Sequence, residues 1–329
     1  MKKSIAIGAL AAAIIIVLAI AIISISPTGQ VTLADQPAAR FGYRQNVAYL
    51  PFFVALEKGY FDYEGVKVEA VLFESSNQTI DALVAGRIDV AISNIPVVLT
   101  LESKSPGMIK LFTMDELDRK DFYDYILVKK DSGINSWQDL EGKKAGIWLG
   151  STAKLLYTKI FKAENLDGKV EVVEMKPELL IQALESGSVD AIFLLEPDAT
   201  IALEKGVGRV LDESLFAKYV MNPMPAAGAF FSTGFAKKNP GQAAKIAAAI
   251  HKAIDFINEK PKEAKKIISK YTPISEDIAV KINTEKYSKL SSAGIERFQE
   301  LADLLYTGGF LDSAVDTSNM FYEIQGGLT

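Results

Sequence analysis

Short apolar runs alternate with amphipathic stretches along most of the chain, a pattern typical of an α/β protein. In the first half, apolar and polar residues alternate over 66–70, which predicts a strand. Helical spacing follows over 80–84 and ends near Gly86, where a glycine suits a helix C-terminus. The apolar run 88–92 then predicts a strand that is buried on both faces, as in a parallel sheet.

The same order of elements returns in the second half of the chain. A strand is predicted over 169–175, a helix over 180–184 that ends at Gly187, and a strand over 189–194. Five residues also recur at a constant offset of 101 positions: Ala82, Leu83, Gly86, Asp89 and Pro96 match Ala183, Leu184, Gly187, Asp190 and Pro197. We therefore predict two similar α/β lobes, each a mostly parallel sheet flanked by helices.

Two further extended runs, 121–130 and 226–240, are predicted to be strands that cross from one lobe to the other. Two crossings make the first lobe discontinuous, so that 39–125 and 230–329 lie around a second lobe of 126–229. Apolar residues at helical spacing predict helices that start at Pro51, Pro240 and Pro261, and another over 295–305.

The N-terminus predicts where the protein is located. Residues 4–26 carry no charge and no proline, and Lys2 and Lys3 precede them. Such a run spans roughly 30 Å of hydrocarbon as a helix, and the lysines predict that the rest of the chain is exported. The segment is either an uncleaved membrane anchor or a cleaved signal peptide, and 27–38 is interpreted as a linker. We expect an extracytoplasmic protein, in the periplasm or at the outer face of the cell membrane.

The composition excludes several kinds of chemistry. The 329 residues include one histidine, His251, and no cysteine. Disulfides, a lipoprotein anchor, zinc–thiolate and iron–sulfur sites, thiol catalysis and multi-histidine metal sites are therefore excluded. With 36 basic and 41 acidic residues the formal charge is −5, which is unfavourable for binding nucleic acid. We expect His251 to lie mid-helix, either packed or at the surface, and we predict no cofactor, no metal and no catalytic residue.

Ligands bind beyond the carboxyl ends of strands in open parallel sheets, so the turns after strands hold the candidate binding residues. The predicted strand 145–149 is followed by Gly150, Ser151 and Thr152 and then by an amphipathic helix. Free backbone N–H groups at the start of this helix, together with the two hydroxyls, form a candidate anion site. The alternative is that Ser151 or Thr152 only caps the helix.

Three candidates lie in the first lobe. Tyr49 precedes the helix that starts at Pro51, and Ser75 and Asn94 follow two predicted strands. These positions place the three side chains at one edge of the sheet, where they could line a pocket. For Tyr49, simple core packing is the alternative.

The second lobe contributes Trp148 and Glu196, which lie at strand ends. Trp148 could stack on a flat ligand or pack in the core. Glu196 could accept from a ligand amine or pair with a ligand cation, or it could form a hydrogen bond or salt bridge between the lobes. The acidic run 115–124 is interpreted as a solvated loop before the first crossing, part of which could form the edge of the pocket.

Four segments, 49–69, 85–94, 140–152 and 184–197, resemble the nitrate/sulfonate/taurine group of ABC-transporter solute-binding proteins. That group includes binders of thiamine-pyrimidine precursors. The resemblance implies a two-lobed type II periplasmic-binding-protein fold that closes over a small solute and presents it to a permease driven by a cytoplasmic ATPase. The family's ligand contacts would fall on Tyr49, Ser75, Asn94, Ser151, Thr152 and Glu196.

From this resemblance we expect a monomeric binding protein that is not an enzyme and that takes a small oxoanion or organic anion, such as a sulfonate, taurine or nitrate. One alternative is an aminopyrimidine or another flat heterocycle, held by stacking and by a carboxylate. Another is a membrane-anchored sensor domain. The pyrimidine synthases that share the fold carry a cysteine-rich motif, which this chain lacks.

Overall fold

A computed structural model describes residues 38–322 of the chain. The predicted N-terminal span 4–26 and nearly all of the predicted linker lie outside the described residues. Within 38–322, no helix combines the length and the apolar character needed to cross a bilayer.

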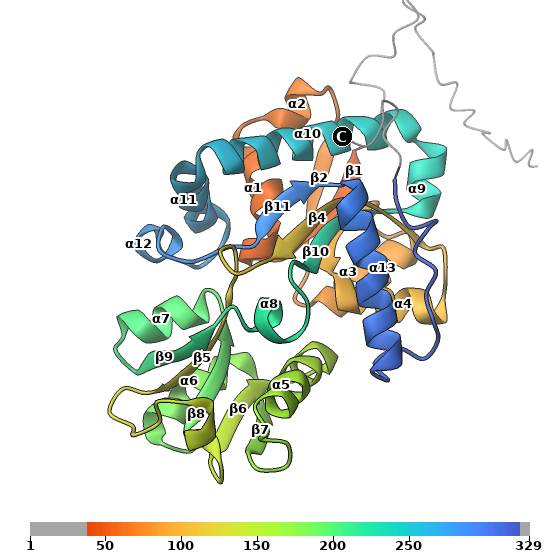
Figure 1. The fold of residues 1–329 in the computed structure, drawn as a ribbon. Coiled ribbons are helices and arrows are strands. Elements are labelled where there is room, and N and C mark those ends of the chain that lie inside the picture. Colours follow the sequence, from red (N-terminus) through yellow and green to blue (C-terminus); the bar gives the residue numbers. More distant parts are fainter. Residues whose placement is uncertain (1–37, 323–329) are drawn as a thin grey trace, which may run out of the picture. The chain divides into compact units, whose positions relative to one another are not determined.

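The described residues form two β-sheets with helices packed on them (Figure 1). The six-stranded sheet has the order β11-β4-β10-β3-β1-β2 and the five-stranded sheet the order β7-β6-β8-β5-β9. The strands of the first sheet are β1 (Ala39–Tyr43), β2 (Val68–Leu72), β3 (Val90–Asn94), β4 (Ile109–Leu117), β10 (Met224–Ser232) and β11 (Lys286–Lys289). Those of the second are β5 (Asp124–Lys129), β6 (Lys144–Trp148), β7 (Glu171–Met175), β8 (Ala191–Leu195) and β9 (Gly208–Glu213).

Most strands of each sheet run in the same direction, as expected, but β10 and β11 in the larger sheet and β5 in the smaller one run antiparallel to the rest. In the six-stranded sheet β1 pairs in parallel with β2 and β3, whereas β10 pairs antiparallel with β3 and β4, as β11 does with β4. In the five-stranded sheet β6 pairs in parallel with β7 and β8, and β5 pairs antiparallel with β8 and β9. Apolar runs indicate that a strand is buried, but its direction depends on the long-range pairing.

Strand β5 occupies most of the predicted crossing run 121–130, whereas β10 covers only 226–232 of the predicted run 226–240, and the rest of that run is mainly helix α9 (Thr233–Lys238). Each of the two strands lies entirely within one sheet: β5 belongs to the five-stranded sheet and β10 to the six-stranded sheet. The chain therefore passes between the sheets in the segments 118–123 and 214–223, which precede these strands. The lobe boundaries predicted from sequence fall inside β5 and β10, a few residues after these passages.

The two sheets repeat one plan, as the constant offset predicted. In each, two parallel pairings are followed by two antiparallel ones, and the six-stranded sheet adds β11 at its edge. The matched aspartates have the same role: Asp89 accepts from the backbone N–H of Arg40 at 2.8 Å, and Asp190 accepts from that of Lys144 at 2.9 Å. Each carboxylate thus ties the start of β3 or β8 to the start of its parallel neighbour.

Local signals place the helices. Ser75 and Ser291 cap α3 and α13 by accepting from backbone N–H groups, and prolines occupy the first turns of α1, α10 and α11. Up to β9 the helices are α1 (Leu50–Glu57), α2 (Tyr60–Tyr63), α3 (Ser76–Val84), α4 (Ile95–Lys104), α5 (Ser151–Ala163), α6 (Pro177–Ser186) and α7 (Asp198–Glu204), with 3-10 turns at Val47–Tyr49 and Trp137–Leu140. After β9 they are α8 (Leu215–Tyr219), α9 (Thr233–Lys238), α10 (Pro240–Glu259), α11 (Pro261–Tyr271), α12 (Glu276–Ala279) and α13 (Ser292–Thr307).

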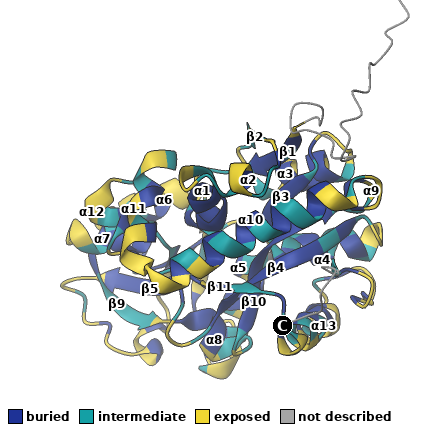
Figure 2. Ribbon diagram, turned by 90° about the horizontal axis from the view of Figure 1, so that it is seen from above, coloured by how far each residue is buried: buried dark blue, intermediate teal, exposed yellow. Residues whose placement is uncertain are grey.

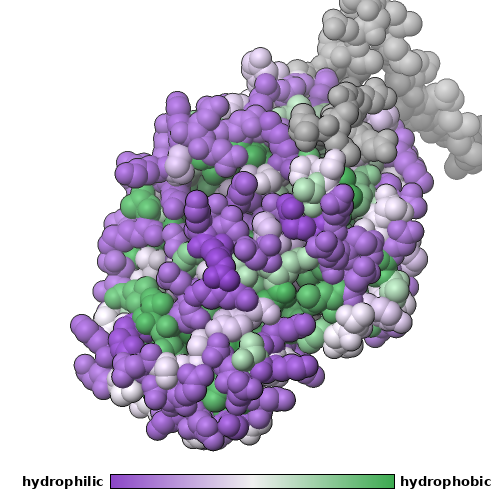
Figure 3. All heavy atoms as spheres, viewed as in Figure 1, coloured by the Kyte–Doolittle hydropathy of each residue, from purple (hydrophilic) through white to green (hydrophobic). Residues whose placement is uncertain are grey.

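The apolar stripes of the long helices face the core. Helix α10 buries Ile246, Ile250, Ile254 and Ile257, which confirms the stripe predicted from sequence. In Figure 2 the strands are mostly buried, while the covering helices expose their outer positions. On the face drawn in Figure 3, polar side chains dominate and apolar ones gather in patches. This arrangement leaves the strand ends as the places where polar side chains can meet inside the fold.

Candidate functional site

A cavity of about 190 Å³ lies where strand ends of the two sheets meet. Its wall includes residues that follow β1 and end β3 in the six-stranded sheet, and residues at the end of β8 in the five-stranded sheet. The polar residues of the wall are Arg44, Asn46, Asn94, Tyr123, Glu196 and Glu285. The site is thus at the carboxyl ends of parallel strands, as expected for an open α/β sheet.

Glu196 is anchored by both parts of the fold. Its carboxylate accepts from the hydroxyl of Tyr125 at 3.1 Å and from the hydroxyl of Thr200 at 2.9 Å, both on its own side. It also accepts at 3.1 Å from the backbone N–H of Asn283, which precedes β11 of the other sheet. Burial raises the pKa of Glu196, and these hydrogen bonds oppose the rise. The sequence alternative of a hydrogen bond between the lobes therefore describes what this carboxylate does in the structure.

Two more bonds link the same elements. The side-chain amide of Asn283 donates to the hydroxyl of Tyr125 at 2.8 Å. Lys281 pairs with Glu204 of α7 at 2.6 Å on the surface. The segment before β11 thus joins the five-stranded sheet through three contacts, and Glu285 lies two residues further along it.

A pair of buried carboxyl groups stands beside the cavity. Glu285, which lines the cavity, is 3% exposed, and Asp115 on β4 is 2% exposed. One oxygen of each, Oε1 of Glu285 and Oδ1 of Asp115, is buried without a hydrogen-bond partner. Burial raises the pKa of Glu285 to about 7, and burial together with the charge of Glu285 raises the pKa of Asp115. The two groups therefore resist being ionised together.

The cavity wall also holds one cationic side chain, Arg44, directly after β1. Its Nη1 donates to the hydroxyl of Ser76 at 3.1 Å, while its Nε is buried and has no partner. The side-chain oxygen of Asn46 is likewise buried and unpaired. Buried polar groups nearly always have hydrogen-bond partners, so a bound ligand can supply the partners that these two groups lack.

Of the residues predicted from sequence to bind a ligand, Asn94 and Glu196 line this cavity. Asn94 precedes the first turn of α4 without capping it through its side chain. Tyr49 is buried, and its hydroxyl donates to the carbonyl of Ile92. The hydroxyl of Ser75 accepts from the backbone N–H of Gln78 as the cap of α3. Tyr49 and Ser75 thus have structural partners already.

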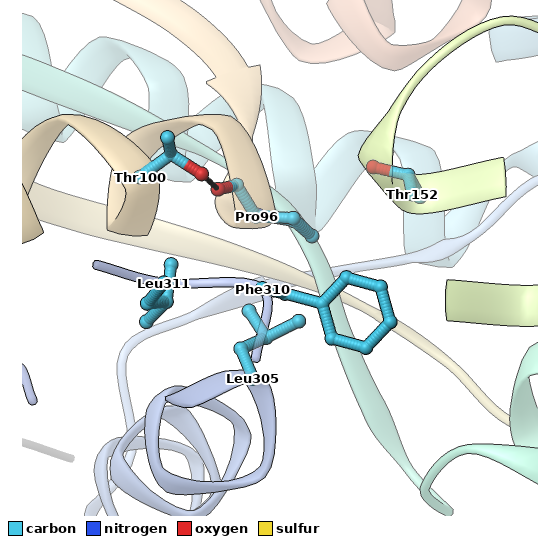
Figure 4. A pocket seen from close by; sticks show the side chains of 6 residues that line it. All are labelled: Pro96, Thr100, Thr152, Leu305, Phe310 and Leu311. Carbon is cyan, nitrogen blue, oxygen red and sulfur yellow. Dashed lines mark hydrogen bonds between the residues drawn. The ribbon is translucent and has the colours of Figure 1, made fainter. Parts of the chain in front are cut away.

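The turn Gly150–Thr152 lies at a second pocket, separate from the cavity that Glu196 lines. Thr152 lines a small pocket together with Pro96 and Thr100 of α4, and Figure 4 shows it facing Phe310 beyond the end of α13. The structure brings α5 opposite α4 here, but the wall of this pocket is mainly apolar. The backbone of Ser151 opens α5, and its side chain lies outside what the structure describes. Trp148 packs against the hydrophobic core.

Five polar residues at or beside the cavity were not among the ligand-binding candidates: Arg44, Asn46, Asp115, Tyr123 and Glu285. Arg44 could have been found, because it directly follows β1. The run 115–124 is not a solvated loop throughout, since its ends lie in β4 and β5 and Asp115, Glu116 and Asp124 are buried. Its other interpretation, a part of the pocket edge, agrees with Tyr123 in the cavity wall. No local signal identifies Glu285, whose position depends on the pairing of β11 with β4.

The fold and the cavity between two α/β sheets define a two-lobed periplasmic-binding-protein fold. The periplasmic aliphatic sulphonate binding protein SsuA of Escherichia coli superposes with a TM-score of 0.73 at 19% identity, covering 88% of this chain and 93% of that chain. The family model described as NMT1/THI5 like matches residues 46–264, and the chain belongs to this family.

Relatives of the chain carry two kinds of name. A protein of Bacillus subtilis (strain 168) named for binding aliphatic sulfonates is 25% identical over 295 residues, which is 85% of this chain and 84% of that protein. The 4-amino-5-hydroxymethyl-2-methylpyrimidine phosphate synthase THI13 of Saccharomyces cerevisiae is 23% identical over 256 residues, 74% of each protein. The family therefore includes a protein named for binding and one named for synthesis.

Proposed function

We propose that this protein is the extracytoplasmic solute-binding component of an ABC importer, which captures a small organic anion between its lobes and delivers it to a permease. The observation that carries the proposal is the cavity at the strand ends, whose wall comes from both sheets and holds an unsatisfied guanidinium N–H of Arg44. A guanidinium binds carboxylate, sulfonate or nitrate oxygens through directed hydrogen bonds.

The mechanism follows from the placement of the wall residues. A solute that contacts both lobes stabilises the closed arrangement by the difference between its affinities for the closed and open forms. Because Asn283 bonds to Glu196 and Glu285 lies two residues away, the segment before β11 is placed to couple the cavity to the link between the lobes. Exclusion of water on closure strengthens the polar contacts to the solute.

The relatives support binding rather than catalysis. SsuA is a periplasmic sulphonate binding protein, and the Bacillus subtilis relative is also named for binding sulfonates. The single histidine, His251, lies on α10 with Nε2 3.2 Å from the carbonyl oxygen of Phe112, and burial lowers its pKa. Location outside the cytoplasm, and attachment through residues 4–26, remain part of the proposal.

Thermal unfolding of the full-length chain in mild detergent tests the proposal. Candidate solutes are ethanesulfonate, taurine, nitrate, an aminopyrimidine and riboflavin, each at millimolar concentration. A solute present at 100 times its Kd stabilises the folded protein by about 2.7 kcal/mol, which is readily seen as a rise in Tm. If none of the solutes raises Tm, solute binding by this cavity is refuted.

A pair of variants locates the site. Arg44→Gln removes the guanidinium of the cavity and is expected to weaken anion binding at least about tenfold, the loss of one charge-assisted hydrogen bond. Arg87→Gln makes the same change of charge at an exposed position just before β3 and is the matched control. Equal affinity of the two variants would show that the anion binds elsewhere.

A further inference from the structure

The acid pair beside the cavity points to the chemical class of the solute, an inference that rests on the proposed function. We propose that Glu285 and Asp115 form a cation subsite that holds the protonated amino group of the solute, while Arg44 holds its anionic group. The solute is then a small zwitterion, and the amino group is required for tight binding. The cavity's volume of about 190 Å³ limits such a solute to a few heavy atoms between its two charges.

The two carboxyl groups are buried and have no basic partner in the part of the chain that the structure describes. Both carboxyl groups are more than nine-tenths buried, and each has an oxygen without a hydrogen-bond partner. Neither forms an ion pair with any lysine or arginine of the described residues. The neighbouring acid, Glu116, is different, since it is paired with Arg297 at 2.8 Å. Burying two ionised carboxylates without partners costs folding free energy unless a bound cation or a proton neutralises their charge.

The geometry of the pair favours an ammonium group. Glu285 lines the cavity, and β4–β11 pairing places Asp115 opposite Tyr287, two residues beyond Glu285. An ammonium has three N–H donors. The wall offers Glu285 and the side-chain oxygen of Asn46, which has no partner, and Asp115 has an unpaired oxygen behind Glu285. Calcium would need six to eight oxygen ligands and magnesium a near-octahedral set, which two carboxyl groups do not supply.

The opposite charge on the cavity wall is that of Arg44. Arg44 follows β1 and its Nε has no partner, so it can meet an anionic group without breaking an existing bond. The raised pKa of Glu285 arises from burial, with no arginine or lysine among its causes. The cavity wall therefore carries a guanidinium and a carboxyl group that form no ion pair with each other, and together they match a molecule with two opposite charges.

In the absence of a solute, a proton bound to one of the two carboxyl groups compensates the pair. The groups that face it are Tyr123 and Tyr287, whose pKa values are raised by burial and by these acids, and Glu116, which Arg297 neutralises. An arriving ammonium takes the place of this proton. Binding of an amine therefore releases a proton from the protein when the pH lies below about 7.

Isothermal titration of the full-length chain with matched solutes tests the subsite. Taurine is compared with ethanesulfonate and β-alanine with propionate, so that each pair differs only by the amino group. We expect the amino member to bind at least about 30-fold more tightly, since a fully buried charge pair contributes roughly this much. The affinity for the amino member should also rise between pH 5.5 and pH 8, while that of its partner should not.

Variants assign the effect to the pair. Glu285→Gln and Asp115→Asn should reduce the preference for the amino member to about threefold or less, while Glu171→Gln, an exposed acid on β7, should retain it. If either variant fails to fold, the pH dependence of the parent still tests the proposal.

The outcomes separate the two proposals. If the amino and desamino members bind equally and without dependence on pH, the cation subsite is refuted while solute binding stands. If no member of either pair binds, and the wider set of solutes also fails to raise Tm, both proposals are refuted.

Discussion

The buried acid pair predicts an unusual dependence of stability on pH, which the substitution Glu285→Gln should abolish. Burial raises the pKa of Glu285 from 4.5 to about 7 in the folded protein. Between these values the folded protein retains a proton that the unfolded chain has lost. The stability that this group contributes is therefore complete below pH 4.5 and is lost as the pH rises through about 7.

The magnitude follows from the size of the shift. One pKa unit corresponds to about 1.4 kcal/mol, so the free energy of unfolding should fall by about 3 kcal/mol between pH 4.5 and pH 8 on account of this group. Glutamine has nearly the same shape and carries no charge. The variant should equal the parent near pH 4.5 and exceed its stability by about 3 kcal/mol at pH 8.

Urea unfolding of the parent and the variant at several pH values between 4.5 and 8 measures this difference, without added solute. Asp124, whose pKa burial raises to about 6, acts equally in both proteins and cancels. Asp115 does not cancel, because the variant removes the charge of Glu285 that helps to raise the pKa of Asp115, and this adds to the variant's advantage at high pH. Glu171→Gln, at an exposed position, is the control, and its free energy of unfolding should change with pH as that of the parent does. If the free energy of unfolding of Glu285→Gln changes with pH as that of the parent does, or if the variant is less stable than the parent at pH 8, then burial does not raise the pKa of Glu285 in the folded protein. Our account of the pair would then be refuted.

Three further predictions concern the fold. Glu196→Ala leaves the donors of Tyr125, Thr200 and Asn283 without their acceptor and should lower the free energy of unfolding by about 2–3 kcal/mol. Urea unfolding measures this loss, and a loss below about 0.5 kcal/mol would contradict the bridging role of Glu196. Gly228→Ala would bring a Cβ within 2.5 Å of the Thr113 carbonyl oxygen, so thermal unfolding should show a loss of roughly 1–3 kcal/mol, whereas Gly241→Ala, with open space at its Cβ, should be tolerated. Asp190→Ala should cost about 1 kcal/mol, and Asp89→Ala should cost more because Asp89 also binds the Arg40 guanidinium; equal costs would show that this ion pair contributes nothing.

Much of the fold could be predicted from local pattern. The helices that begin at Pro240 and Pro261 follow from a proline in the first turn and from apolar residues at helical spacing, both of which act within a few residues. The repeat was visible because the same local solution is used twice: Asp89 and Asp190 each tie a strand to its parallel neighbour. The placement of Asn94 and Glu196 at the cavity follows from the rule that strand ends form the site.

The candidates that missed the cavity show the limit of that rule. Ser75 and Thr152 do lie at turns after strands. The rule does not predict which pocket a turn lines, or whether a hydroxyl already forms a hydrogen bond within the protein. The cap of α3 engages Ser75, and Thr152 faces an apolar pocket between α5 and α4. Such outcomes depend on how the two sheets are placed against each other.

The sequence by itself determined the α/β class, the repeated plan and the position of most helices, because these depend on periodicity and capping within short stretches. Only the tertiary structure decided the antiparallel direction of β5 and β10 and the bond from Asn283 to Glu196. It also decided the meeting of Asp115 with Glu285, which requires β11 to pair with β4. Distant segments acquire common neighbours only when strands pair, and the charges of a buried pair act on each other only once burial has removed the water between them.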